Sequence, residues 1–223
     1  MEPNVLAKYI DHTVLKAEAA PKEIIKLCHE ANEYGFAAVC VNACYVSLAK
    51  SLVANGIHVA SVVGFPLGAT STAAKSAETS FAVKDGATEI DMVINVGWLK
   101  AGLHSQVEAD IRAVVIAADD VPVKVIIEAA LLSDADKVTV CQLAKTAGAA
   151  YVKTSTGFGP GGATIADVAL MRQTVGPEIG VKASGGVRTL EATLAMIEAG
   201  ASRIGTSSGV AIVEESKSRH GSV

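Results

Sequence analysis

The sequence is poor in aromatic side chains, which make up 4% of its 223 residues, and neither sign of charge is in large excess. Its formal net charge of −4 provides no basic face for a nucleic acid. The most apolar stretch, residues 121–132, is interrupted by Lys124 and Glu128, so it is too short and too charged to span a bilayer. Residues 1–13 lack the basic segment and long apolar run of a signal peptide. These absences predict a cytoplasmic protein with neither a nucleic-acid nor a membrane partner.

Residue spacings typical of metal sites are also missing. The cysteines form no CxxC pair, and the histidines form no HxH or HExxH pattern. A metal-dependent mechanism therefore has little support, and we expect no bound metal. We predict that the thiols are buried and reduced; they belong to Cys28, Cys40, Cys44 and Cys141.

The chain does contain a large supply of small and branched apolar side chains. Half of its residues are hydrophobic and 19% are charged, so it can bury a sizeable core. Ala, Val, Ile and Leu dominate, which suits helices packed on parallel strands. A length of 223 residues is normal for one α/β barrel, and no linker marks a second domain.

Four segments of the sequence repeat one pattern: a helix-like stretch, a glycine, and then a short apolar strand. They read NEYGFAAVCV, VKDGATEIDM, KTAGAAYVKT and IEAGASRIGT, with the glycine at Gly35, Gly86, Gly148 and Gly200. Glycine just past a helix end adopts the left-handed conformation without a steric cost. The pattern therefore predicts four helix–strand units, each with a strand buried on both faces.

Further strands are predicted at residues 9–13, 57–64, 123–128 and 179–184. Eight strands that alternate with helices imply a parallel sheet, and eight such units close into a (β/α)8 TIM barrel with a short helix before the first strand. An open doubly wound sheet is the alternative, although the GxGxxG loop typical of such sheets is missing. We predict one domain over residues 1–223, with residues 216–223 as a frayed tail.

Equivalent positions in the four repeats place two charged side chains within the sheet. Five residues after each repeat glycine lie Cys40, Asp91, Lys153 and Gly205, which share one level of the sheet if the units are equivalent. Charged groups are rarely buried without a partner or a function. Because a barrel enzyme carries its active site at the carboxyl ends of the strands, these positions predict an active-site cluster.

Two lysines occupy neighbouring predicted strands, Lys153 in AYVKTS and Lys182 in GVKASGG. Burial and a nearby second cation both lower the pKa of an amine, and a neutral amine attacks a carbonyl to form a Schiff base. The alternatives are lysines that point outward between helices, or lysines held in salt bridges within the barrel.

Asp91 is the predicted proton handler, because Schiff-base aldol chemistry takes a proton from a substrate hydroxyl and moves another at carbon. It is equally a charge partner for Lys124 or Lys153, and the two interpretations are compatible. Lys124 shares the strand parity of Ile126 and Glu128. It therefore either faces the barrel interior near Asp91 or caps the barrel floor.

Two glycine-rich loops near the end of the chain predict a phosphate site. Gly185 and Gly186 follow the seventh strand, and residues 205–209 follow the eighth strand and open a short helix over residues 210–215. Amides at a helix N-terminus favour an anion, and barrels often bind phosphate at these loops. Arg188 is a candidate for an added cation. The alternative is that the glycines serve only as turn residues.

Segments along nearly the full length resemble the deoxyribose-phosphate aldolase family. They read YIDHT, AAVCV, VGFPLG, EIDMVIN, VKVIIE, YVKTSTGFGPGGAT, VKASGGVRT and RIGTSSG. The resemblance implies a lyase that reversibly cleaves 2-deoxy-D-ribose 5-phosphate to glyceraldehyde 3-phosphate and acetaldehyde. It also implies that no metal or organic cofactor is needed and that the protein is a homo-oligomer, most simply a dimer.

The resemblance also implies residue roles. It makes Lys153 the Schiff-base lysine, Lys182 the second lysine that keeps Lys153 neutral and aids proton transfer, and Asp91 the proton donor and acceptor, acting through water. The predicted substrate pocket consists of Asp11, Thr13, Cys40, Lys124 and Thr156. The predicted phosphate-binding residues are Gly157, Gly185, Gly186, Gly205, Ser207 and Ser208.

The chain departs from the family pattern away from the two lysines and Asp91. Phe158 stands where some members carry a lysine, so one phosphate cation is missing. Ala129 replaces the usual threonine, and the tail has no tyrosine where some members end in one.

Two other functions stay open from the sequence. One is a Schiff-base aldolase for a different phosphorylated sugar, which an assay of donor specificity would separate. The other is a non-catalytic sugar-phosphate-binding barrel, which explains the glycine loops but not Lys153, Lys182 and Asp91 together.

Overall fold

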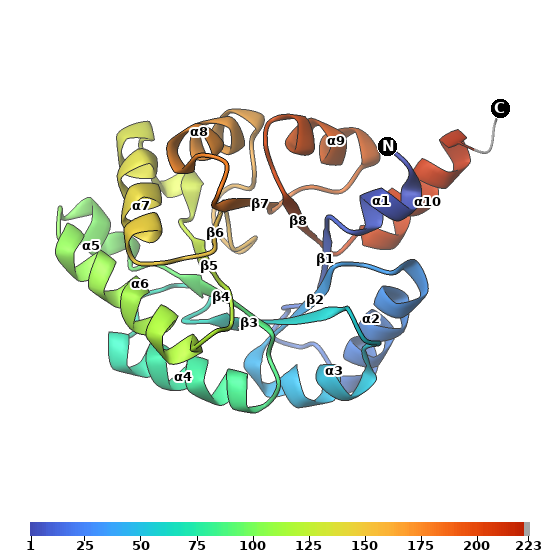
Figure 1. Ribbon diagram of the computed structural model, residues 1–223, viewed down its shortest axis with the longest axis horizontal. Helices are drawn as coiled ribbons and strands as arrows, with labels where there is room; N and C mark the ends of the chain where they lie inside the picture. Colours follow the sequence, from blue (N-terminus) through green and yellow to red (C-terminus); the bar gives the residue numbers. More distant parts are fainter. Residues whose placement is uncertain (221–223) are drawn as a thin grey trace.

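Strand β1, Ile10–Thr13, pairs with β8, Arg203–Thr206, and closes eight parallel strands into a barrel in chain order (Figure 1). The structure is a computed structural model that describes residues 1–220. The closure confirms the predicted (β/α)8 barrel and excludes the open doubly wound sheet. The remaining strands are β2 Ala38–Val41, β3 His58–Val63, β4 Glu89–Val93, β5 Val123–Ile126, β6 Tyr151–Lys153 and β7 Gly180–Ser184.

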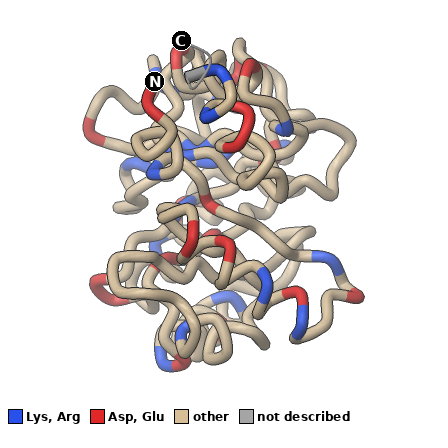
Figure 2. Tube along the Cα trace, turned by 90° about the vertical axis from the view of Figure 1, so that its right-hand side faces the viewer, with Lys and Arg blue, Asp and Glu red and all other residues tan. Residues whose placement is uncertain are grey.

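Helices surround the strands, and α1, Pro3–Ala7, precedes β1 as predicted and lies beside α10, Gly209–His220 (Figure 1). Within the described residues, no helix is long and apolar enough to cross a membrane. Both signs of charge are spread along the trace in Figure 2. The other helices are α2 Pro21–Tyr34, α3 Val46–Leu52, α4 Thr72–Lys84, α5 Val96–Lys100, α6 His104–Ala118, α7 Asp134–Thr146, α8 Ile165–Val175 and α9 Leu190–Glu198, with 3-10 turns η1 Ala43–Tyr45 and η2 Ala129–Leu131.

Local signals in the sequence explain where these helices begin and end. Gly35 caps α2 in the left-handed conformation, with a φ of 65°, and the other three repeat glycines also have positive φ. At the opposite end, the Ser133 hydroxyl accepts a hydrogen bond from the backbone amide of Asp136 and caps α7. Thr189 caps α9 in the same way.

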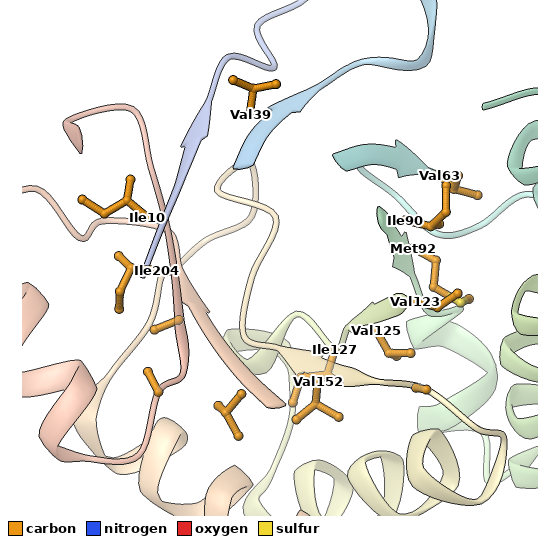
Figure 3. Packing of buried hydrophobic residues seen from close by; sticks show 14 of the residues in the cluster. Ile10, Val39, Val63, Ile90, Met92, Val123, Val125, Ile127, Val152 and Ile204 are labelled. Carbon is orange, nitrogen blue, oxygen red and sulfur yellow. The ribbon is translucent and has the colours of Figure 1, made fainter. Parts of the chain in front are cut away.

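The main hydrophobic core lies between the outer face of the strands and the surrounding helices. Figure 3 shows side chains such as Ile90, Val152 and Ile204 pointing outward from three strands, and each is fully buried. Burying one such side chain stabilises a fold by about 1.5–3 kcal/mol. A much smaller apolar cluster contains Leu15, Cys40, Ala60 and Val62, with Phe65 packed against it.

Side chains inside the barrel form layers supplied by alternate strands. Cys40 Sγ lies 4.0 Å from Asp91 Oδ2, and Lys153 Nζ lies 2.8 Å from the same oxygen. Gly205 is the member from β8, where an added Cβ would lie 3.0 Å from Lys182 Cε. The four repeats are therefore equivalent, as predicted, and the glycine leaves room for Lys182.

Two element boundaries differ from the prediction by more than one residue. β5 ends at Ile126 because Glu128 has a φ of 52°, which an extended strand cannot contain. α10 continues past residue 215, since Lys217 and Arg219 form ion pairs of 2.9 and 2.6 Å with glutamates one turn earlier. Residues 216–220, predicted as part of a frayed tail, are thus helical, and residues 221–223 lie outside the described residues.

Candidate active site

Lys153 and Lys182 are direct partners across β6 and β7, and both side chains point into the barrel. Lys153 Nζ lies 2.8 Å and Lys182 Nζ 2.7 Å from the same oxygen, Asp91 Oδ2. Lys182 is fully buried and Lys153 is 2% exposed. The alternative in which these lysines point outward between helices is therefore excluded. The salt-bridged alternative and the catalytic interpretation both fit this geometry.

The cluster continues toward the amino ends of the strands. Lys124 Nζ lies 2.9 Å from Asp91 Oδ1 and 2.5 Å from Glu89 Oε2, and Lys182 Nζ lies 2.5 Å from Asp11 Oδ2. Arg203 bridges Asp11 and Glu89. We call these seven side chains the interior charge network: Asp11, Glu89, Asp91, Lys124, Lys153, Lys182 and Arg203.

The network shifts the pKa values of its two central lysines in opposite directions. Burial lowers the pKa of Lys153, the Asp91 carboxylate opposes this, and the Lys182 ammonium lowers it further, with the balance below the ordinary value. Burial also acts to lower the pKa of Lys182, but Asp11 and Asp91 together raise it well above the ordinary value. Lys182 therefore stays an ammonium while Lys153 is the amine that loses its proton first.

Asp91 is held as a carboxylate. Burial acts to raise its pKa, but Lys124, Lys153 and Lys182 hold that pKa well below the ordinary value. A group with so low a pKa retains a proton only briefly, so Asp91 is suited to pass a proton between the lysines and the substrate rather than to store one. Its predicted role in proton transfer stays a prediction.

A cavity of about 380 Å³ opens at the carboxyl ends of the strands. Lys153 is the member of the interior charge network that reaches it, and most of the other lining residues lie at the carboxyl ends of β1, β7 and β8 or in loops. The cavity thus exposes the amine with the lowered pKa while its charged partners stay covered. The predicted site residues that line it are Thr13, Lys153, Thr156, Gly157, Gly185, Gly186, Gly205 and Ser207.

The other predicted substrate residues lie deeper. Asp11, Cys40 and Lys124 are fully buried, and they contact Asp91 or Lys182. This arrangement does not support the predicted contact of these three side chains with the substrate. They lie behind the cavity and hold Asp91 and Lys182 in place. Ser208 lines a neighbouring cavity of about 550 Å³, which shares lining residues with the first cavity, Ser207 among them.

The loops after β6, β7 and β8 form the wall that was predicted to hold phosphate. Gly185 and Gly186 have φ values of 87° and 79°, a conformation that favours glycine. The loop after β6 approaches so closely that a Cβ on Gly162 would lie 2.1 Å from the carbonyl oxygen of Gly185. Glycine is therefore required for the loops to meet. The first turn of α10 adjoins the neighbouring cavity, which Val210 and Ala211 line.

Two cations accompany this wall. Lys16 from the β1–α2 loop and Arg188 from the β7–α9 loop both line the cavity. Arg188 was considered as an added cation from the sequence, whereas Lys16 was missed. Phe158, which replaces the lysine of some relatives, instead packs edge-on against Phe65, with ring centroids 5.4 Å apart. Lys16 and Arg188 are thus the cations available to an anion in the cavity.

Glu89 and Arg203 were not predicted as site residues from the sequence, although strand alternation indicates that both face the barrel interior. Glu89 stands two residues before Asp91, and Arg203 two residues before Gly205, so strand alternation places each on the inward face. Among the described residues, no group of three or more His, Cys, Asp or Glu side chains is placed to hold a metal ion.

An amine that loses its proton easily, held beside a permanent ammonium and open to a cavity, is suited to imine formation with a carbonyl compound. The class that the fold and this cluster define is a barrel lyase of the Schiff-base type.

Comparison with known proteins assigns the family. Residues 5–215 match the family described as DeoC/LacD family aldolase, and the chain belongs to it. It is 62% identical over 210 residues to the deoxyribose-phosphate aldolase of Streptococcus pneumoniae (strain CGSP14), covering 94% of this chain and 96% of that one. It is 61% identical over 216 residues to that of Geobacillus sp. (strain WCH70), covering 96% of both chains.

The fold agrees with solved structures of relatives. The deoxyribose phosphate aldolase of Aeropyrum pernix, described as having a unique tetrameric structure, superimposes with a TM-score of 0.89 at 34% sequence identity. The match covers 98% of this chain and 93% of that one.

Proposed function

We propose that the protein is a class I aldolase that reversibly cleaves 2-deoxy-D-ribose 5-phosphate to D-glyceraldehyde 3-phosphate and acetaldehyde through a Schiff base on Lys153. One observation carries the proposal. Lys153 and Lys182 share one oxygen of Asp91 at the carboxyl ends of the strands, and Lys153 alone of the three lines the cavity. The identity of more than 60% to deoxyribose-phosphate aldolases over most of the chain supports the choice of substrate.

The reaction begins when the neutral amine of Lys153 attacks the aldehyde carbon C1 of the open-chain sugar. The resulting carbinolamine loses water and leaves a protonated imine. A proton then leaves the C3 hydroxyl, the bond between C2 and C3 breaks, and its electron pair moves toward the imine nitrogen to give an enamine. Glyceraldehyde 3-phosphate departs at this point. Protonation of the enamine at C2 and hydrolysis of the imine release acetaldehyde and restore Lys153.

The geometry supports the following roles for the neighbouring residues. Lys182 supplies the positive charge that keeps Lys153 neutral, and Asp91 connects the two nitrogens and relays protons. The amides of the β7 and β8 loops, with Lys16 and Arg188, hold the phosphate at the other end of the cavity. Binding at that end positions C1 beside Lys153 and accounts for a phosphorylated substrate.

Trapping with borohydride tests the mechanism. Acetaldehyde and borohydride should add one ethyl group to the folded protein, and peptide mapping should find it on Lys153. An adduct on Lys182 or Lys124 would overturn the assignment of roles, and a folded protein that forms no adduct would overturn the Schiff-base mechanism. Turnover measured with 2-deoxyribose 5-phosphate and with other phosphorylated sugars establishes the preferred donor.

The assembly and location follow as further proposals. We infer a homo-oligomer, with a dimer as the simplest form, because a relative with the same fold is described as tetrameric; light scattering during gel filtration tests this. We also infer a cytoplasmic enzyme, since all four cysteines are free thiols, as expected in a reducing compartment. Three of them are buried as predicted, whereas Cys44 is exposed. Fractionation of cells that express a tagged chain tests the location.

A further inference from the structure

We propose that Arg203 and Glu89, at the amino ends of the strands (the barrel floor), are positioning residues that set the charge state of Lys153 in opposite directions: Arg203 favours its neutral form and Glu89 its protonated form. The inference rests on the proposed function, because a neutral Lys153 matters only to an amine that reacts. Neither side chain is among the residues that line the active-site cavity. They are 8% and 3% exposed, so they act through other residues rather than on the substrate.

Arg203 acts through Asp11. Its Nε donates to Asp11 Oδ1 at 2.7 Å, while the other carboxylate oxygen, Oδ2, lies 2.5 Å from Lys182 Nζ. Asp11 is thus shared between the guanidinium and the ammonium. If the guanidinium were absent, Asp11 would draw Lys182 more strongly, and Asp91 would be left to pair more closely with Lys153.

Glu89 acts through Lys124 with the opposite sign. Its Oε2 lies 2.5 Å from Lys124 Nζ, and the same nitrogen lies 2.9 Å from Asp91 Oδ1. Lys124 is thus shared between two carboxylates. If Glu89 lost its charge, Lys124 would pair fully with Asp91, and the attraction of Asp91 for a proton on Lys153 would weaken.

The charges of the network explain why the floor matters. The network contains three carboxylates and four basic side chains, so it is neutral when one basic side chain carries no charge, and we infer that this one is Lys153. Two other polar side chains face the network, the thiol of Cys40 beside Asp91 and the ring of Tyr151, 5.8 Å from Lys124 Nζ. Removing one floor charge leaves a net charge in a medium of low polarity, where charges several ångströms apart interact strongly.

The test measures the pH at which trapping of acetaldehyde on Lys153 by borohydride reaches half of its maximum. Arg203→Met should move this midpoint upward by about one pH unit, and Glu89→Gln should move it downward by about one unit. Both signs follow from the direct interaction with the Lys153 ammonium, repulsion by Arg203 and attraction by Glu89, as well as from the relays through Asp11 and Lys124. A purely structural role would not produce opposite shifts, because both substitutions remove buried hydrogen bonds in the same region.

Matched variants separate charge from packing. Arg203→Lys retains the positive charge and should keep the wild-type midpoint. The double variant Glu89→Gln with Arg203→Met removes one charge of each sign and should return the midpoint close to the wild-type value, although it loses both sets of ion pairs. Lys75→Met removes a fully buried ammonium elsewhere in the molecule and should leave the midpoint unchanged.

The outcomes distinguish this inference from the proposed function. If wild-type protein forms no adduct on Lys153, the proposed function fails. If the adduct forms but both single variants shift the midpoint in the same direction, or neither shifts it, the role of the floor is overturned while the aldolase stands. Should Arg203→Met fail to fold, Glu89→Gln and the double variant still test the sign.

Discussion

The outer and inner faces of the barrel wall bury opposite kinds of side chain, apolar on the outside and charged on the inside. On β4, Ile90 and Met92 point outward into the hydrophobic core, whereas Glu89 and Asp91 point inward into the interior charge network. The outward face gains stability from burying apolar surface. The inward face buries ion pairs, which rarely add net stability and are costly when one partner is lost. The outside of this wall therefore maintains the fold, and the inside maintains one amine in an unusual state.

A second buried lysine sharpens the comparison. Lys75 on α4 is also fully buried, with Nζ 2.6 Å from Asp110 Oδ2 and 2.9 Å from the carbonyl oxygen of Val93. Here one ammonium faces one carboxylate, and the charges balance. In the interior charge network the cations outnumber the carboxylates by one. We therefore expect a reactive lysine to need both burial and this surplus of positive charge.

The strongest test of the inner face is Lys153→Leu. Turnover should fall by at least about 10⁴-fold, because the covalent step is removed rather than weakened. The melting temperature should not fall, since an apolar side chain replaces a buried amine and Asp91 keeps Lys124 and Lys182 as partners. If the melting temperature fell so far that unfolding explained the loss of turnover, Lys153 would be a structural residue.

The buried pair on the helix side should behave in the opposite way. Lys75→Met should lower the free energy of unfolding by about 3–5 kcal/mol, because Asp110 is left buried with only the hydroxyl of Thr72 beside it. Urea denaturation measures the effect. If this variant also changed the midpoint pH for trapping, the separation between the two buried lysine sites would not hold.

On the outer face, Ile90→Ala should lower the free energy of unfolding by about 2–5 kcal/mol by leaving a cavity in the core. Ile90→Val, the matched control, should cost about 0.5–1.5 kcal/mol. Both should retain the wild-type midpoint for trapping below their melting temperatures. An altered midpoint would show that packing outside the wall also controls the charge inside it.

Ser208→Asp tests phosphate binding at the carboxyl ends of the strands, where the inner and outer faces of the barrel wall meet. A carboxylate next to the first turn of α10 should raise KM for 2-deoxyribose 5-phosphate by at least about tenfold through repulsion of the phosphate. Unphosphorylated deoxyribose should be affected little, and Ser208→Asn serves as the uncharged control. An equal loss on both substrates would place the phosphate elsewhere.

The smallest predicted effect is the shift caused by Lys182→Leu. The Lys182 ammonium contributes to the lowered pKa of Lys153, so its removal raises that pKa and moves the trapping midpoint upward by about one pH unit. If Lys182 matters mainly as a proton shuttle, the midpoint stays and turnover falls after the adduct has formed. If neither changes, Lys182 is structural.

The sequence predicted the barrel because its repeats are local. The glycine after each helix and the apolar strand that follows are decided by neighbouring residues, so Gly35 and Gly200 identified their units without any tertiary information. The relative register of the strands could also be predicted, because equivalent repeats place Asp91 and Lys153 at one level of the barrel. The depth of Asp11 and Lys124 could not be predicted, since it depends on how residues from distant strands divide the interior. Lys16 was missed because a lysine in a loop has no periodic signal.

The salt bridge between Asp11 and Arg203 joins the first strand to the last, across 192 residues of chain. During synthesis, β6 with Lys153 leaves the ribosome before β8. Until β8 has also emerged, the interior charge network lacks the guanidinium of Arg203. Cleavage or premature termination before Arg203 has the same consequence. We therefore expect the chemical reactivity of Lys153 to be a property of the finished chain, so that its labelling by an aldehyde would report that the barrel has closed.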